Sequence, residues 1–186
     1  MTKIVQKEDN ILRQIAKEIP VNKIATLGTR RVLKEMSLAL KSQDDGVAIA
    51  APQVGYSLSV FIVSGKIFDK DFVTNRKERF SREKAVDDVE KTEEKTKNIV
   101  FINPKISKLS KEKYWVPEGY LSVRWLYGKT YRSKKATITA YDENGKKFQR
   151  GASELLAQIF QHETDHLKGI LFTDHAKDIK EELPQK

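Results

Sequence analysis

Residues 162–166 read HETDH, and this stretch decides which fold the sequence predicts. It lies in a run, residues 154–168, in which apolar side chains recur at helical spacing, so we predict a helix there. Residues four apart lie on one face of a helix, which places His162 above His166 on the inward side. Two imidazoles in this arrangement can bind one metal ion, and Glu163 between them can act as a general acid and base. Two core histidines beside a solvated acidic patch are the alternative interpretation.

The ends of this helix are also marked in the sequence. Ser153 is a candidate N-cap, the carboxylate of Glu154 suits the positive end of the helix dipole, and Gly169 is a candidate stop. Leu155 and Ile159 continue the apolar stripe on which the two histidines lie. We therefore expect the helix to bury its histidine face against the rest of the fold.

The remaining elements are expected upstream of this helix. Residues 22–43 have the periodicity of a long helix, although Gly28 makes its first turns unfavourable. Several β-rich runs follow, and the pair Asn144-Gly145 predicts a hairpin because both residues tolerate positive φ. The order is a helix, several strands, then a helix, which is an α+β fold of mostly antiparallel sheets packed around the C-terminal helix. The expected strands are residues 60–63, 99–102, 114–123, 136–141 and 146–149.

Length and charge limit the other classes of protein. We expect residues 1–186 to form a single domain, and no apolar run is long enough to cross a bilayer. The N-terminus resembles neither a signal nor a transit peptide, so a cytoplasmic location is expected. The net charge of +9 favours acidic partners, but the lysines are mixed with acids and form no compact basic motif. We expect no DNA partner and no membrane partner.

Residues 64–98 differ in composition from the rest of the chain. They carry many charges and few apolar side chains, and connections of this length are uncommon unless they are functional or disordered. We interpret them as a charged surface insertion, with residues 81–97 partly helical. A solvated loop and a partner-binding segment are the two alternatives.

Two further segments precede the histidine helix, GVAIAAPQVG at residues 46–55 and EGYLS at residues 118–122. With HETDH at residues 162–166 they resemble the three motifs of peptide deformylase, in the same order and at similar separations. The resemblance extends over roughly residues 4–177. It implies an enzyme that removes the formyl group from the N-terminal formyl-methionine of nascent proteins, with a contact to the ribosome that is at most weak.

The resemblance also implies roles for individual residues. The metal ligands would be His162 and His166, Glu163 would transfer the proton, and Gln53 with the backbone N–H of Leu121 would stabilise the oxyanion. The metal would be one divalent ion, Fe²⁺ by resemblance, with Zn²⁺ and Ni²⁺ as alternatives. The residues expected to contact the substrate are Val47, Ala48 and Gly119. For Gln53 the alternative is a structural amide, and for the apolar residues it is core packing.

Other polar residues near the motifs have open roles. Asp165 is either a partner that orients a histidine or part of the helix surface, and Arg132 is a suggested partner of the internal carboxylate of Glu118.

One position departs from the family pattern. The family has cysteine as its third metal ligand in the second motif, whereas this chain has Tyr120 there and no cysteine anywhere. A phenol oxygen lies farther from the backbone than a thiolate and ionises less readily. Three outcomes follow: a phenolate-ligated site, a weakened site of two histidines, or no metal. The last would make the chain an inactive homologue that binds formylated N-termini or a ribosomal partner.

Overall fold

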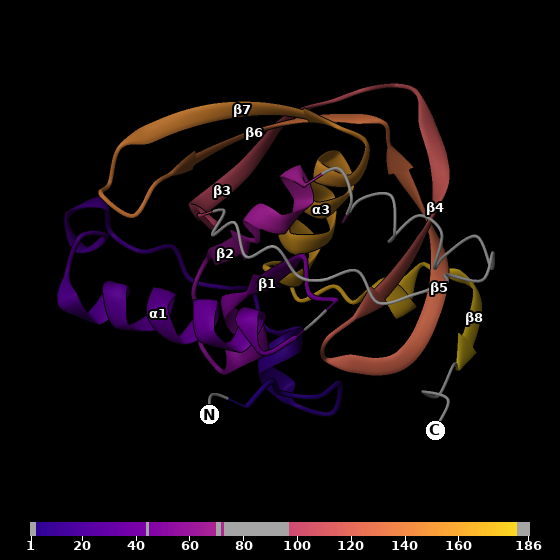
Figure 1. Ribbon diagram of the computed structural model, residues 1–186, viewed down its shortest axis with the longest axis horizontal. Coiled ribbons are helices and arrows are strands. Elements are labelled where there is room, and N and C mark those ends of the chain that lie inside the picture. Colours follow the sequence, from indigo (N-terminus) through magenta and orange to yellow (C-terminus); the bar gives the residue numbers. More distant parts are fainter. Residues whose placement is uncertain (1–2, 44, 70–71, 73–96, 182–186) are drawn as a thin grey trace.

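Two antiparallel sheets and two α-helices make up most of the described chain (Figure 1). The computed structural model describes residues 3–43, 45–69, 72 and 97–181, with only the backbone of residues 120 and 123–125. One sheet has the strand order β1-β2-β3-β6-β7 and the other the order β4-β5-β8. The helices are α1 (Leu27–Lys41) and α3 (Glu154–His166), and the strands are β1 (Ala48–Ala50), β2 (Val60–Val63), β3 (Ile99–Leu109), β4 (Lys113–Tyr120), β5 (Val123–Ser133), β6 (Lys135–Tyr141), β7 (Lys147–Ser153) and β8 (Lys177–Glu181).

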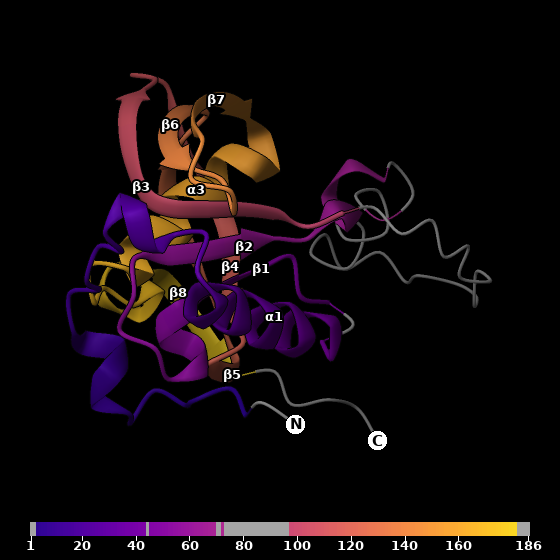
Figure 2. The same cartoon turned by 90° about the vertical axis from the view of Figure 1, so that its left-hand side faces the viewer.

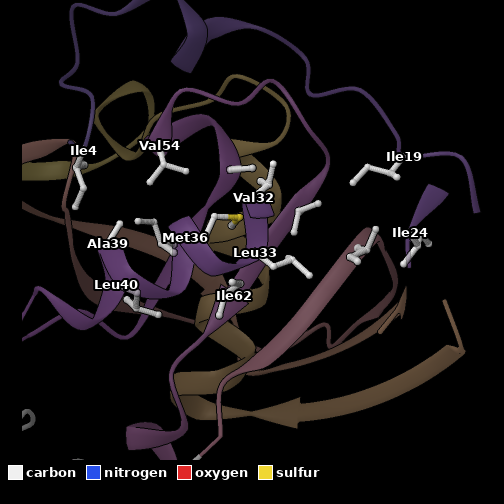
Figure 3. Packing of buried hydrophobic residues seen from close by; sticks show 14 residues of the cluster. Ile4, Ile19, Ile24, Val32, Leu33, Met36, Ala39, Leu40, Val54 and Ile62 are labelled. Atoms are coloured by element: carbon white, nitrogen blue, oxygen red, sulfur yellow. The ribbon is translucent and has the colours of Figure 1, made fainter. Parts of the chain in front are cut away.

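Helix α1 covers one face of the five-stranded sheet. Its buried side chains at helical spacing, among them Val32 and Met36, pack against Ile62 of β2 (Figure 3). The apolar residues that the helical periodicity places towards the core are all buried: Val32, Leu33, Met36, Ala39 and Leu40. This face of α1 therefore follows directly from its periodicity.

Helix α3 covers the opposite face of the same sheet. Phe160 packs against Phe101 of β3 with ring centroids 5.2 Å apart, and Phe61 of β2 lies in the same cluster. Because successive residues of a strand point to opposite faces, Phe61 faces α3 while its neighbour Ile62 faces α1. Strand β2 is accordingly buried on both faces, which explains why its sequence is a continuous apolar run.

The three-stranded sheet closes the other side of α3. Figure 1 shows β4 and β5 beside α3, with β8 outermost, and Figure 2 shows β1 and β2 between α3 above and α1 below. Strands β4 and β5 pair along their length and change register between Gly119 and Tyr120. Helix α3 therefore lies between the two sheets, with its polar face towards β5.

Several sequence expectations about element bounds are wrong. Residues 114–123 are not one strand, because the chain turns at residues 121–122 and returns as β5. Helix α1 begins later than residue 22, since the hydroxyls of Thr26 and Thr29 both bind the carbonyl of Lys23 and compete with helical bonds. The sequence predicts only a polar tail over residues 178–186, but residues 177–181 form β8, whose side chains are all exposed. The short 3₁₀ turns are Asn10–Arg13, Val21–Lys23, Ala51–Val54, Gly65–Phe68 and Phe172–Asp174.

Both expected ends of α3 are confirmed in position. Ser153 is the N-cap residue with extended backbone, but its side chain makes no capping bond, and Glu154 lies in the first turn with φ 50° as the chain turns from β7 into α3. At the other end Gly169 has φ 73°, and a Cβ there would lie 2.5 Å from the carbonyl oxygen of Arg13. Glycine is therefore required at this stop by both conformation and space.

The hairpin expected between β6 and β7 is confirmed. Its turn is held by Asp142, whose side chain accepts bonds from the backbone N–H groups of Asn144 and Lys146. Only Gly145 has positive φ, at 81°. The Asn-Gly pair thus predicts the hairpin correctly, although Asn144 acts without positive φ.

The beginning of the expected surface insertion belongs to the core. Ile67 is buried and packs in the same cluster as Phe61 and Phe160. Residues 73–96, including most of the stretch expected to be partly helical, lie outside the described residues. In the described part of the chain, no helix combines the length and the apolar character needed to cross a bilayer.

Candidate metal and catalytic site

The two histidines of α3 lie one turn apart, as their spacing predicts. Their ring centroids are 5.2 Å apart and the rings are inclined at 72°. His166 is fully buried and His162 is largely buried. Their helix lies between both sheets, so the rings point into the interior between the two layers.

A carboxylate on β4 fixes the orientation of the first histidine. His162 Nδ1 lies 3.1 Å from Glu118 Oε2. An ionised carboxylate can only accept, so Nδ1 carries the proton and Nε2 is left as the ligand atom. Metal-binding histidines commonly donate their other N–H to a carboxylate in this way.

Arg132 on β5 joins this carboxylate to the histidine helix. Its Nε and Nη2 donate to both oxygens of Glu118 at 2.9 and 3.0 Å, and its Nη1 donates to Asp165 Oδ2 at 2.5 Å. The suggested pairing of Arg132 with Glu118 is therefore confirmed. Asp165 binds Arg132, so it supports His162 through Arg132 and Glu118.

The charges of this network keep one another ionised despite burial. Burial alone would raise the pKa of Glu118, but His162 and Arg132 outweigh it and hold that pKa well below its usual range. Burial would likewise lower the pKa of Arg132, but the carboxylates of Glu118 and Asp165 outweigh the effect of burial and raise this pKa. The result is a fixed anionic acceptor behind His162.

His166 and Glu163 differ from this network, because burial favours the uncharged form of both side chains. Burial, followed by the nearby His162, lowers the pKa of His166 well below its ordinary value, so its imidazole is neutral. Burial raises the pKa of Glu163 to about 7, and its Oε2 has no hydrogen-bond partner among the described residues. A buried carboxyl without a partner for one oxygen is costly in a core and typical of a catalytic group.

Gln53 connects the first motif to the second. Its Oε1 accepts a bond from the N–H of Ala50 at 2.8 Å, and its Nε2 lies 3.3 Å from Ser122 Oγ. Because a backbone N–H can only donate, this bond fixes which end of the amide is the oxygen. The Nε2 group carries two protons, so one stays available beyond the bond to Ser122. Gln53 is therefore both a structural amide and an oriented donor.

The residues expected to contact the substrate fall in two places. Val47 and Ala48 pack in the cluster of α3, and Gly119 lies on β4; Leu121, whose backbone N–H is the expected oxyanion donor, packs against the cluster of α1. At Gly119 a Cβ would lie 2.7 Å from the ring of Tyr127, so close packing on β5 already requires glycine there. Tyr120 ends β4, and its side chain lies outside the description.

Two glutamines of α3 belong to the site's support and carry no sequence signal. Gln161 Oε1 accepts from the N–H of Ser133 at 2.9 Å, and its Nε2 donates to the carbonyl of the same residue at 3.0 Å. Gln158 donates to the carbonyl of Pro117 at 2.9 Å. Both glutamines hold α3 against β4 and β5, and glutamine on a helix gives no indication of such a partner.

The donor set fits a divalent metal ion. A neutral His166 and a His162 with Nε2 as ligand atom are two imidazole donors one helical turn apart, and the buried Glu163 follows His162 directly. Within the described residues, no group of three or more His, Cys, Asp and Glu side chains is arranged to hold a metal. The described side chains therefore offer two ligands. In the family pattern the third ligand is at position 120.

An α+β fold whose C-terminal helix carries His162 and His166 one turn apart, with a buried Glu163 between them, is typical of a metal-dependent hydrolase. The model of the polypeptide deformylase family matches residues 1–182, and the chain belongs to that family. Membership gives it a deformylase function that depends on a catalytic metal ion.

Individual relatives agree with this assignment. The chain is 36% identical over 169 residues to peptide deformylase 2 from Clostridium acetobutylicum, covering 90% of this chain and 89% of the relative. Among solved structures, the peptide deformylase from Legionella pneumophila has a TM-score of 0.74 at 29% identity, covering 96% of this chain and 87% of that one. The deformylase from Synechococcus elongatus in complex with actinonin has a TM-score of 0.72 at 28% identity, covering 95% of this chain and 79% of that one.

Proposed function

We propose that this chain removes the N-formyl group from formyl-methionyl N-termini at the site formed by its three motifs. The observation that carries the proposal is their convergence. Gln53 contacts Ser122 at 3.3 Å and Glu118 contacts His162 at 3.1 Å, which links the first motif to the second and the second to the third. Such convergence of donors, imidazoles and a buried acid suits hydrolysis of an amide.

In the proposed mechanism the protein residues have distinct tasks. His162 and His166 would hold one divalent metal ion, Fe²⁺ by family resemblance, with Zn²⁺ and Ni²⁺ as alternatives. A bound metal of this kind lowers the pKa of a water and polarises a carbonyl. Glu163 accepts the proton from the attacking water and delivers it to the leaving amine, a task that suits a pKa near 7.

The oxyanion is stabilised from the other side of the site. Gln53 donates from Nε2, with the backbone N–H of Leu121 as the second proposed donor. The amide of Gln53 is held in place by Ala50, so it needs no reorientation during the reaction. Donors of this kind typically contribute about 10²–10³ in rate. The proposed contacts to the substrate's methionine are Val47, Ala48 and Gly119.

The proposed location and partners follow from the substrate. Formylated N-termini arise at the ribosome, so we place the activity in the cytoplasm. The net charge of +9 supports a weak, salt-sensitive contact with ribosomes.

Three variants test the proposed site through metal content and hydrolysis of a formyl-methionyl peptide. Glu163→Gln should keep the metal and lower kcat by about 10²–10⁴, because the amide cannot transfer the proton. His166→Ala should lose the metal and the activity together. His175→Ala is the matched control, since His175 is exposed and outside α3. Equal metal content in the parent and the His166 variant would refute the ligand assignment.

A further inference from the structure

The outer face of the three-stranded sheet carries an exposed aromatic pair. Strands β4 and β5 direct Glu118 and Arg132 inward to α3, so the alternate residues Trp115 and Tyr131 face outward. The two rings are directly opposite in register with centroids 5.2 Å apart, and the residues are 45% and 53% exposed. The two rings form one contiguous exposed apolar surface rimmed by charged residues, and such patches mark interaction sites.

Lysines surround this pair on the same face. Lys113 Nζ lies 5.9 Å from the centroid of the Tyr131 ring, and Lys177 Nζ lies 5.1 Å from that of Trp115. Lys129 is in register with Lys177 of β8, and its Nζ lies 3.6 Å from Asp178. We name this surface the aromatic–lysine face: Lys113, Trp115, Lys129, Tyr131 and Lys177.

The residues of this face are far apart in the sequence. They come from β4, β5 and β8, and β8 lies after the histidine helix. Pairing of the three strands brings them together, so a scan of the sequence for a compact basic motif does not find them. Three lysines and one neighbouring acid give the face an excess of positive charge.

We propose that the aromatic–lysine face binds single-stranded RNA. Aromatic rings on a sheet provide stacking surfaces for unpaired bases, and flanking lysines neutralise phosphates. A duplex keeps its bases stacked internally and cannot use the rings in this way. An acidic protein would need the lysines but gain nothing specific from the ring pair, so the combination favours RNA.

Binding at this face is separable from catalysis. The same strands carry Glu118 and Arg132 on their inner face, where they hold the histidine helix. None of the five residues of the aromatic–lysine face is assigned to the reaction. Loss of RNA binding should therefore leave hydrolysis of a short formyl peptide unchanged, and failure of this proposal would leave the deformylase assignment intact.

Fluorescence anisotropy with a labelled oligouridylate of about ten nucleotides tests the proposal at about 50 mM salt. Trp115→Ala with Tyr131→Ala should weaken binding at least about tenfold through lost stacking. Trp115→Leu with Tyr131→Leu keeps the apolar bulk and should lose as much, whereas Trp115→Phe with Tyr131→Phe should bind like the parent. An abasic oligomer should bind the parent as weakly as the oligouridylate binds the alanine variant.

Lysine substitutions test the electrostatic contribution of this face to RNA binding. Lys113→Gln with Lys177→Gln should weaken binding and reduce the slope of log K against log salt by about 1.4, from two phosphate contacts. The matched control removes two exposed lysines of α1, Lys34→Gln with Lys41→Gln, and should leave the slope nearly unchanged.

Four results would overturn the proposal. They are absence of binding at low salt, equal losses in the α1 control, indifference to the ring substitutions, and tighter binding to phosphatidylserine vesicles or a polyaspartate peptide than to RNA. Unchanged activity on a formyl peptide confirms that each variant is folded.

Discussion

The two faces of the β4–β5 pair differ in how deeply their charged side chains are buried. On the inner face Arg132 and Glu118 form a buried, bidentate pair whose side chains are 8% and 1% exposed. On the outer face Lys129 and Asp178 are 3.6 Å apart and more than half exposed. A surface pair of the second kind is worth at most about 1 kcal/mol, whereas removing one partner of a buried pair leaves a charge that water cannot reach.

Because of this difference, the inner face of the β4–β5 pair positions His162, whereas the outer face is open to a binding partner. The inner face is rigid because each charged group has several partners from different strands and from α3. Such a network holds His162 in one orientation. The outer face leaves its aromatic rings and lysines accessible, which suits a partner that arrives from solution.

The largest effect is expected from breaking the inner pair. Arg132→Leu leaves the carboxylates of Glu118 and Asp165 without their guanidinium, so the free energy of unfolding should fall by about 3–5 kcal/mol. Lys129→Leu changes the same strand on the outer face and should cost less than about 1 kcal/mol. Urea unfolding of both variants measures the comparison. Similar losses would mean that burial does not distinguish the two faces.

A smaller effect is expected where the strands change register. Tyr120→Cys supplies the short anionic ligand of the family pattern at the end of β4. Metal affinity and hydrolysis should rise together by at least about tenfold, since even indirect supports of a metal site change affinity by about 10–100-fold. A cysteine introduced on the outer face, Tyr131→Cys, is the matched control and should change neither. If the parent already binds one equivalent as tightly as the Cys variant, another ligand completes its site.

The sequence predicts the site better than the sheet that supports it. The spacing of His162 and His166 is local, so helical periodicity alone gives their face. Strand β8 has only exposed side chains, so no alternation of apolar and polar residues distinguishes it from a polar tail. The pairing of Arg132 with Asp165 depends on how β5 packs on α3, which no local pattern encodes.

The details at element ends have a similar origin. Ser153 takes the N-cap position that its composition predicts, but its side chain makes no capping bond, and its backbone pairs with Lys135 of β6. The sequence predicts one strand over residues 114–123 because the turn at residues 121–122 contains neither glycine nor proline. The second motif, residues 118–122, therefore contains a turn that its composition does not indicate.

The smallest effect is expected at Gly119, where β4 packs closely against Tyr127 of β5. A Cβ at this position would lie 2.7 Å from the ring of Tyr127 and 3.3 Å from the carbonyl oxygen of Leu126, so the ring must shift. Gly119→Ala should therefore lower the free energy of unfolding by about 1–2 kcal/mol. Gly151→Ala in β7 is the matched control, because its Cβ would meet nothing closer than the hydroxyl of Thr137 at 4.0 Å.

Stability and kinetics together decide what Gly119 does. The control should be neutral or gain about 0.5–1 kcal/mol, since glycine is unfavourable inside a strand. If Gly119→Ala is destabilised while KM for a formyl peptide is unchanged, glycine is needed there for packing against Tyr127. If its thermal unfolding matches the parent and KM rises, the ring moves without cost and the proposed contact with substrate explains the residue. The second result would place part of the substrate's binding site on the strand pair itself, at the boundary between its two faces.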